Sequence, residues 1–288
     1  MNDFALCTDM DTVMELLEIT AGDLAKSIGV APMTLSRWRK NEKQASASNL
    51  NAFYNFAFDH GIRLNRIKEQ LFREDCRNHS VILFHGAKTY IDGKISIEKS
   101  KSTNDFGKGF YCGESLEQSA MFVAGYPESS LYILEFDKTG LTGTRFNVDR
   151  DWMLLIAYFR NKLTAFSKHP VILDLLSRIQ NVDYLVAPIA DNRMFEIIDS
   201  FIDGENTDVQ CQHCLSATNL CNQDVLFSNK ALDQLQIMRH CYLASSEKSF
   251  YLSSKREEAR VGNDKVKIAR TQYRGQGKYI EEILNESI

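Results

Sequence analysis

The sequence predicts an α+β fold with an all-helical N-terminal bundle, a second domain that mixes strands with helices, and a helical C-terminal tail. Three observations support this. Apolar residues recur at helical spacing through residues 11–72, short apolar runs bounded by polar residues begin at Val81, and a tail rich in both charges starts at Lys255. The predicted domains are residues 1–75, 80–240 and 241–288.

Length and composition indicate a soluble globular protein. The chain has 288 residues, 44% apolar content and a net charge of −4, enough for one large or two modest cores. No apolar run approaches the roughly eighteen residues of a membrane span, and no basic, apolar leader follows Met1, so we expect a cytoplasmic protein without a membrane partner. Seven scattered cysteines favour reduced thiols over a disulfide framework.

Residues 20–40 have the pattern of two helices joined by a tight turn. Thr20 suits the N-cap of the first helix, with Asp23 three residues later, and Gly29 suits its end. Pro32 suits the first position of the second helix, where a missing N–H costs nothing. This helix-turn-helix pattern resembles the DNA-binding domain of phage repressors over residues 8–73.

That resemblance implies duplex DNA as a partner of the second helix. The residues expected to contact bases and phosphates are Thr34, Arg37, Arg39, Lys40 and Lys43. Acidic residues in the same region offset these cations, so we expect a modest affinity unless a homodimer spans two half-sites. In the alternative interpretation, the helical unit docks on a protein partner or on the neighbouring domain.

The stretch from Val81 to Cys112 carries the strongest chemical signal. A short apolar run ends in His85-Gly86, and the motif Asp-Phe-Gly-Lys-Gly-Phe-Tyr follows at residues 105–111. Gly86 would let a ligand approach the main chain, and Tyr111 offers a flat ring for stacking. In the alternative interpretation, His85 ends a strand, the glycines form a turn and Tyr111 belongs to the core.

Together these residues resemble the ADP-ribosyltransferase-like superfamily, specifically a bacterial group of uncharacterised domains, over about residues 80–235. The resemblance implies a split β-sheet domain that takes NAD as its substrate. It implies that His85 contacts the adenosine ribose, that the Gly86 backbone contacts the nicotinamide amide, and that Tyr111 stacks on the nicotinamide ring. Gly109, in the same motif as Tyr111, joins the expected NAD-binding residues.

A polar cluster follows the apolar strand pattern of residues 182–189. Asp191 and Asn192 in this cluster are candidate NAD-binding residues. Related domains often have Ala-Asp-Asp here, so Asn192 puts any role for a second carboxylate in doubt. Asp105 is a further catalytic candidate, for charge and proton handling.

Gln223 lies in the strand pattern of residues 222–227, where the superfamily places its third signature residue. That residue is usually a glutamate that bonds the nicotinamide ribose and stabilises positive charge as the glycosidic bond breaks, for which a neutral amide is a weaker substitute. We therefore name Gln223 and Tyr111 as catalytic residues. From the sequence alone, Gln223→Glu should retain or raise NAD hydrolysis.

Two other features remain open. Cys211, His213 and Cys214 invite a zinc interpretation, but a second close pair of ligands is missing, and we predict no metal site. The charged tail is expected to be a solvated helix, with a nucleic-acid contact or a lid as alternatives.

The function predicted from the sequence is an ADP-ribosyltransferase that transfers ADP-ribose from NAD to an unidentified protein or nucleic-acid acceptor, as a toxin or phage-defence effector. One alternative is a non-catalytic, NAD-sensing DNA-binding transcriptional regulator. Another is an interaction module of a toxin–antitoxin or phage-defence system.

Overall fold

A computed structural model describes residues 4–218 and 220–285, apart from the side chain of Asn192. The chain forms two compact units that interleave in sequence. Unit 1 comprises residues 1–92, 116–137 and 235–255, and unit 2 comprises residues 93–115, 138–234 and 256–288. Within unit 1, the strand Ser130–Asp137 pairs with the strand that begins near residue 80, and a strand near residue 240 pairs with Ser130–Asp137, so segments distant in sequence share one unit.

Unit 1 begins with helices only, as predicted. They are α1 (Leu6–Leu17), α2 (Ala21–Ser27), α3 (Pro32–Lys40), α4 (Ala47–Asp59) and α5 (Leu64–Glu74). The Thr20 hydroxyl accepts from the Asp23 N–H at 3.2 Å, and the Asp23 carboxylate accepts from the Thr20 N–H at 3.0 Å. Gly29 has φ +74° after α2, and Pro32 opens α3. Trp38 is buried in the core of this helical region.

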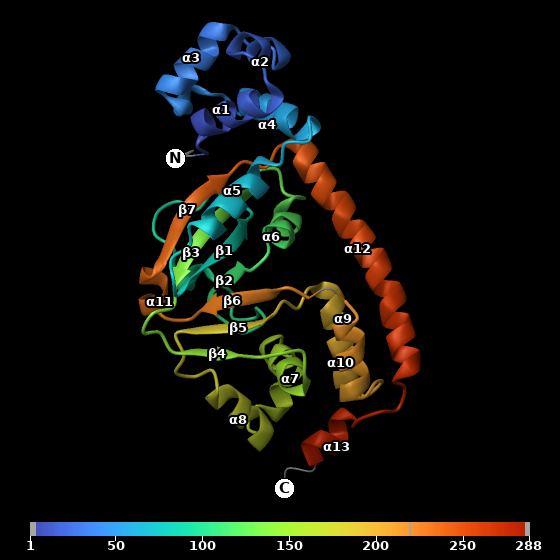
Figure 1. Cartoon of the computed structure of the whole chain (residues 1–288). Coiled ribbons are helices and arrows are strands. Elements are labelled where there is room, and N and C mark those ends of the chain that lie inside the picture. The colour runs from blue at the N-terminus through green and yellow to red at the C-terminus, as the bar shows by residue number, and fades with distance from the viewer. Residues whose placement is uncertain (1–3, 219, 286–288) are drawn as a thin grey trace. The chain divides into compact units, whose positions relative to one another are not determined.

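The remaining elements of unit 1 form a small antiparallel sheet with helices on it. The sheet has the order β1 (Ser80–Ala87), β3 (Ser130–Asp137), β7 (Leu235–Cys241). Helices α5 and α6 (Leu116–Val123) pack on β1 (Figure 1). His85 and Gly86 lie inside β1, and His85 pairs in register with Tyr132.

The helical region packs on the segment that joins β7 to the next helix, also within unit 1. The Tyr54 and Tyr242 rings stack with their centroids 4.8 Å apart, and the Asn65 amide donates to the Tyr242 carbonyl at 2.9 Å. The long helix α12 (Ser245–Gln272) follows, and it confirms the expected helical tail. Its residues up to Lys255 belong to unit 1 and those from Arg256 to unit 2.

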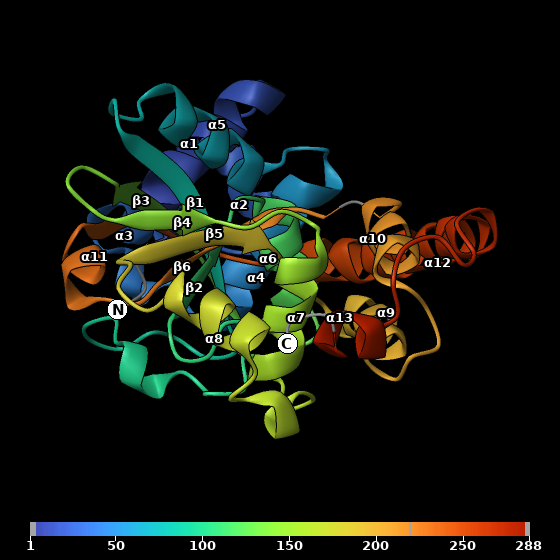
Figure 2. The same ribbon diagram turned by 90° about the horizontal axis from the view of Figure 1, so that it is seen from below.

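Unit 2 contains strands in the order β4 (Gly143–Arg145), β5 (Tyr184–Pro188), β6 (Asn222–Leu226), β2 (Phe110–Gly113). The β4–β5 pair is parallel, and the other two pairs are antiparallel. The helices are α7 (Arg150–Phe159), α8 (Pro170–Ser177), α9 (Asn192–Ile202), α10 (Asp208–Ser216), α11 (Asn229–Asp233) and α13 (Ile280–Asn285). Helices α7 and α8 lie together on one side of the β4–β5 pair (Figures 1 and 2).

Helix α7 ends at Phe159, because Asn161 adopts the left-handed conformation with φ +65°. Arg160 therefore occupies the C-cap position. Within the described residues, no helix is long and apolar enough to cross a bilayer.

Candidate functional site

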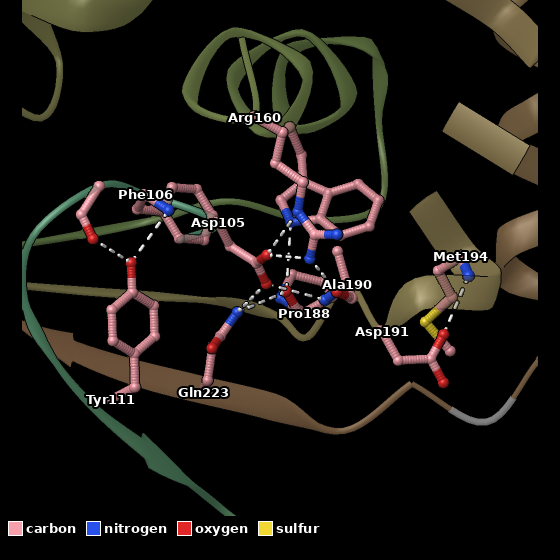
Figure 3. A network of polar contacts seen from close by, with 11 residues as sticks. Asp105, Phe106, Tyr111, Arg160, Pro188, Ala190, Asp191, Met194 and Gln223 are labelled. Carbon is pink, nitrogen blue, oxygen red and sulfur yellow. Dashed lines mark hydrogen bonds and ion pairs between the residues drawn. The ribbon is translucent and has the colours of Figure 1, made fainter. Parts of the chain in front are cut away.

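A buried carboxylate, Asp105, is the centre of a polar network in unit 2 (Figure 3). One carboxylate oxygen accepts from the Arg160 guanidinium, at 2.6 Å from Nη2 and 3.2 Å from Nε. The other accepts from the Ala190 N–H at 3.2 Å and from the Gln223 amide at 3.1 Å. Both oxygens of Asp105 are thus held in place by donors from three separate elements.

Arg160 reaches this carboxylate from the end of α7. Its Nη2 also donates to the Ala190 carbonyl at 2.7 Å, and its guanidinium lies over the Phe195 ring, 4.5 Å from the centroid. These contacts satisfy the Asp105 charge inside the protein. Arg160 was not among the site residues predicted from the sequence, and its ion pair with Asp105 became apparent only from the structure.

Gln223 enters the network from β6. The residue is 5% exposed, and its amide nitrogen donates to Asp105 and to the Pro188 carbonyl at 3.3 Å. Figure 3 shows the amide nitrogen directed at Asp105 and the amide oxygen on the opposite side. The structure therefore brings Gln223 and Asp105 together, two residues that the sequence names as catalytic candidates.

Tyr111, on the neighbouring strand β2, braces the loop that carries Asp105. Its hydroxyl donates to the Gly107 carbonyl at 2.7 Å and accepts from the Phe106 N–H at 3.1 Å. Burial raises the pKa of this hydroxyl, so it stays protonated and available as a donor. The residue is partly exposed, and its hydroxyl is engaged in both of these contacts.

Packing explains three glycines of the sequence motifs. A Cβ on Gly109 would lie 2.5 Å from a Val225 methyl, and one on Gly107, which has φ +76°, would lie 2.9 Å from the Phe159 ring. In unit 1, a Cβ on Gly86 would lie 2.6 Å from the Ser119 carbonyl oxygen on α6. Glycine is required at each of these positions by the protein's own packing, whether or not a ligand also approaches.

The other predicted NAD-binding residues lie outside the network. His85 is half-buried on β1 of unit 1. Asp191 caps α9 by accepting from the Met194 N–H at 2.9 Å, and its side chain is exposed. Asn192 is the first residue of α9, and its side chain lies outside the described part of the chain.

An open groove of about 830 Å³ lies beside the Asp105 loop, within unit 2. Its walls include the Phe106, Phe159 and Phe227 rings, and Lys108 stands among the polar residues of its lining. Phe106 and Lys108 belong to the loop that Tyr111 braces, so an occupant of the groove would contact that loop directly.

The cysteines of α10 make contacts with neighbouring helices. The Cys211 thiol lies 3.5 Å from the Ile197 carbonyl, and the Cys214 thiol lies 3.7 Å from the Val266 carbonyl. The described residues contain no group of three or more side chains placed to hold a metal ion. Burial raises the pKa of both thiols, to about 12 for Cys211.

Of the residues that the sequence predicts to contact DNA, most are exposed to solvent, and one forms an ion pair within the helical region. Arg37 and Lys40 are exposed on α3, and Thr34 is half-buried there. Arg39 forms an ion pair with Asp11 of α1. Lys43 is exposed in the short turn after α3.

A comparison with known proteins places the central part of the chain in a family. Comparison with curated proteins and with solved structures returned no match. A family model matches residues 81–237, which contain the Asp105 network and both strands that deliver Tyr111 and Gln223. Because this match covers more than half of the sequence, the chain belongs to the family described as a protein of unknown function (DUF3990).

Proposed function

We propose that this protein is an ADP-ribosyltransferase that cleaves NAD and transfers ADP-ribose to a protein or nucleic-acid acceptor. The observation that carries the proposal is the side-chain amide of Gln223. Asp105 and the Pro188 carbonyl occupy its nitrogen, which leaves its oxygen for a ligand hydroxyl. The resemblance to ADP-ribosyltransferases assigns a ribose hydroxyl to this position, and Tyr111 lies on the adjacent strand.

In the proposed reaction, the bond between the ribose C1′ and the nicotinamide nitrogen breaks, and its electron pair leaves with neutral nicotinamide. A nucleophile of the acceptor bonds to C1′ and loses its proton to the solvent. Gln223 holds the reacting ribose, and Tyr111 stacks on the leaving ring. Holding the ribose matters because a small misplacement of reacting atoms can cost about a hundredfold in rate.

A second candidate function is a DNA-binding regulator that senses NAD without cleaving it. One observation favours it: the Arg160 guanidinium neutralises Asp105, so the network next to Gln223 carries no net negative charge. Such a site offers little stabilisation to the positive charge that develops as the glycosidic bond breaks.

Nicotinamide release and NAD binding, measured on the same preparations, separate the two functions. Wild-type protein is incubated with labelled NAD and with protein extract, duplex DNA or RNA as acceptor. For a transferase, Gln223→Ala should keep NAD affinity within several-fold, since one hydrogen bond contributes about 1 kcal/mol, while nicotinamide release falls sharply.

The exposed Gln272 provides the matched control, because Gln272→Ala removes the same amide far along the tail helix. Binding of NAD without any nicotinamide release, with every acceptor, would favour the regulator. Absence of NAD binding at millimolar concentration would rule out both functions.

A further inference from the structure

The amide of Gln223 can take only one orientation. Its two N–H groups are used by Asp105 and by the Pro188 carbonyl, both of which can only accept. A flipped amide would place its oxygen against these two acceptors. The amide oxygen accepts no hydrogen bond from the described residues, and it is not fully buried.

Asp105 keeps its own orientation through other donors. The Ala190 N–H shares one carboxylate oxygen with Gln223, and the Arg160 guanidinium holds the other oxygen in two hydrogen bonds. Arg160 in turn is fixed by the Ala190 carbonyl. Arg160 therefore orients Asp105, and Asp105 orients the Gln223 amide, whose oxygen is the remaining acceptor.

We propose that Asp105 and Arg160 are positioning residues that orient the Gln223 amide so that its oxygen accepts a hydrogen bond from a ligand hydroxyl. The same contacts disfavour a glutamate at position 223. The catalytic part of this inference rests on the proposed function, in which the hydroxyl belongs to the nicotinamide ribose. The positioning part concerns the protein alone and holds with or without NAD.

This arrangement accounts for a glutamine at the position where the ADP-ribosyltransferase-like superfamily usually has a glutamate. A glutamate at this position would put a second carboxylate about where the amide nitrogen now lies, 3.1 Å from an Asp105 oxygen. Two carboxylates at this distance cannot both be ionised at little cost. The structure therefore leads to the opposite expectation from the sequence, and Gln223→Glu should lower activity.

The positioning part is tested by a double-mutant cycle of stability with Gln223→Glu, Asp105→Asn and the combination of both. At pH 8 in the wild-type background, Gln223→Glu should lower the folding equilibrium constant at least tenfold. In the Asp105→Asn background the same change should cost much less. The cost should also shrink towards pH 5, because a protonated Glu at position 223 can donate to Asp105. An equal cost in both backgrounds and at both pH values would overturn the positioning role.

The ligand part is tested with NAD and an NAD analogue that lacks the 2′-hydroxyl of the nicotinamide ribose. Wild type should bind the analogue several-fold more weakly than NAD, whereas Gln223→Ala should bind the two equally. Arg160→Ala should lower kcat at nearly constant KM, and Arg160→Lys should recover part of the loss. Equal binding of NAD and the analogue by wild type would overturn the hydroxyl assignment. If NAD does not bind at all, the proposed function fails, and the stability cycle still decides whether Asp105 positions Gln223.

Discussion

Each unit contains a buried polar cluster around one carboxylate, and the two clusters differ in whether that carboxylate has an ion-pair partner. The Asp105 cluster of unit 2 has one and is called the matched cluster, whereas the Glu247 cluster of unit 1 has none among the described residues and is called the unmatched cluster. In unit 2, the Asp105 carboxylate has the Arg160 guanidinium at 2.6 Å. In unit 1, the Glu247 carboxylate accepts from the Asn65 amide at 3.0 and 3.2 Å, and no described cation forms an ion pair with it. Lys68, whose charge acts on Glu247, forms its ion pair with Asp9 at 2.6 Å instead.

The lack of an ion-pair partner goes with a raised pKa of the Glu247 carboxyl group. Burial raises the pKa of Glu247 to about 7, and the Asn65 hydrogen bonds and the charges of Lys68 and Arg63 only partly oppose this. The Asn65 side-chain oxygen is itself buried without a hydrogen-bond partner. The Glu247 carboxylate, which has no ion-paired cation among the described residues, is therefore poised to take up a proton.

The largest expected effect comes from removing the anion of the matched cluster. Asp105→Ala leaves the Arg160 charge without its partner and the Gln223 and Ala190 donors without an acceptor. We expect a loss of about 3–5 kcal/mol in the free energy of unfolding, measured by urea denaturation. Asp191→Ala is the control, because it removes an exposed helix cap and should cost about 1 kcal/mol. Equal losses in the two variants would contradict the matched-charge account.

The next effect concerns the unmatched cluster and depends on pH. Because the folded-state pKa of Glu247 is raised to about 7 from an ordinary 4.5, its protonated form stabilises the fold at low pH. This stabilisation is lost as the pH rises through about 7, and it amounts to on the order of 2–3 kcal/mol. Glu247→Gln mimics the protonated form, so it should match wild type at pH 5 and exceed it by that amount at pH 8.

Urea denaturation of both proteins at the two pH values gives the comparison. Tyr251 also hydrogen-bonds Glu247, and an amide at position 247 can keep a contact with it as well as with Asn65. A difference between variant and wild type that is the same at pH 5 and pH 8 would show that Glu247 does not titrate in this range.

A smaller effect is expected from the hydroxyl that braces the matched cluster. Tyr111→Phe removes the contacts with the Gly107 carbonyl and the Phe106 N–H, and it should lower the free energy of unfolding by about 1–2 kcal/mol. The aromatic ring remains, so NAD affinity should hardly change, whereas Tyr111→Ala should weaken binding by roughly 1–2 kcal/mol through lost stacking. Calorimetry with NAD and urea denaturation give the two readouts. Tyr279→Phe, at a more exposed ring, is the control.

Local patterns in the sequence predicted the elements that depend on local chemistry. The Thr20 cap, the left-handed Gly29 and the opening Pro32 each act within a few residues, and all three are confirmed. The strand that carries His85 was predicted from a short apolar run between polar residues, and the strand that carries Gln223 from the alternation of a half-buried strand. The second strand exists, but its residues from Gln223 to Leu226 are all buried.

Contacts between residues distant in sequence could not be predicted in this way. Arg160 follows its partner Asp105 by 55 residues, and a single arginine at a helix end carries no sign of which acid it will meet. Likewise, the need for glycine at position 86 comes from Ser119 and Val123 on a helix more than thirty residues later. The sequence predicted Asp105, Tyr111 and Gln223 as site residues. Only the structure shows that Gln223 donates to Asp105 and that Tyr111 contacts the loop that carries Asp105.

The smallest expected effect on stability belongs to exposed cations that neither cluster uses. Arg37 and Lys40 on α3 are exposed, and no ion pair with either is found among the described residues. Reversing both charges, Arg37→Glu with Lys40→Glu, should change the free energy of unfolding by less than about 0.5 kcal/mol.

If α3 contacts duplex DNA, as its likeness to phage repressors implies, the same change should abolish a gel shift on the protein's own upstream region. Each lost phosphate contact should also lower the slope of log affinity against log salt by about one. Lys255→Glu with Arg256→Glu alters the net charge equally at exposed positions of α12, so it separates a local contact from a general charge effect. A gel shift that both double variants retain, or that both lose equally, would exclude recognition through α3.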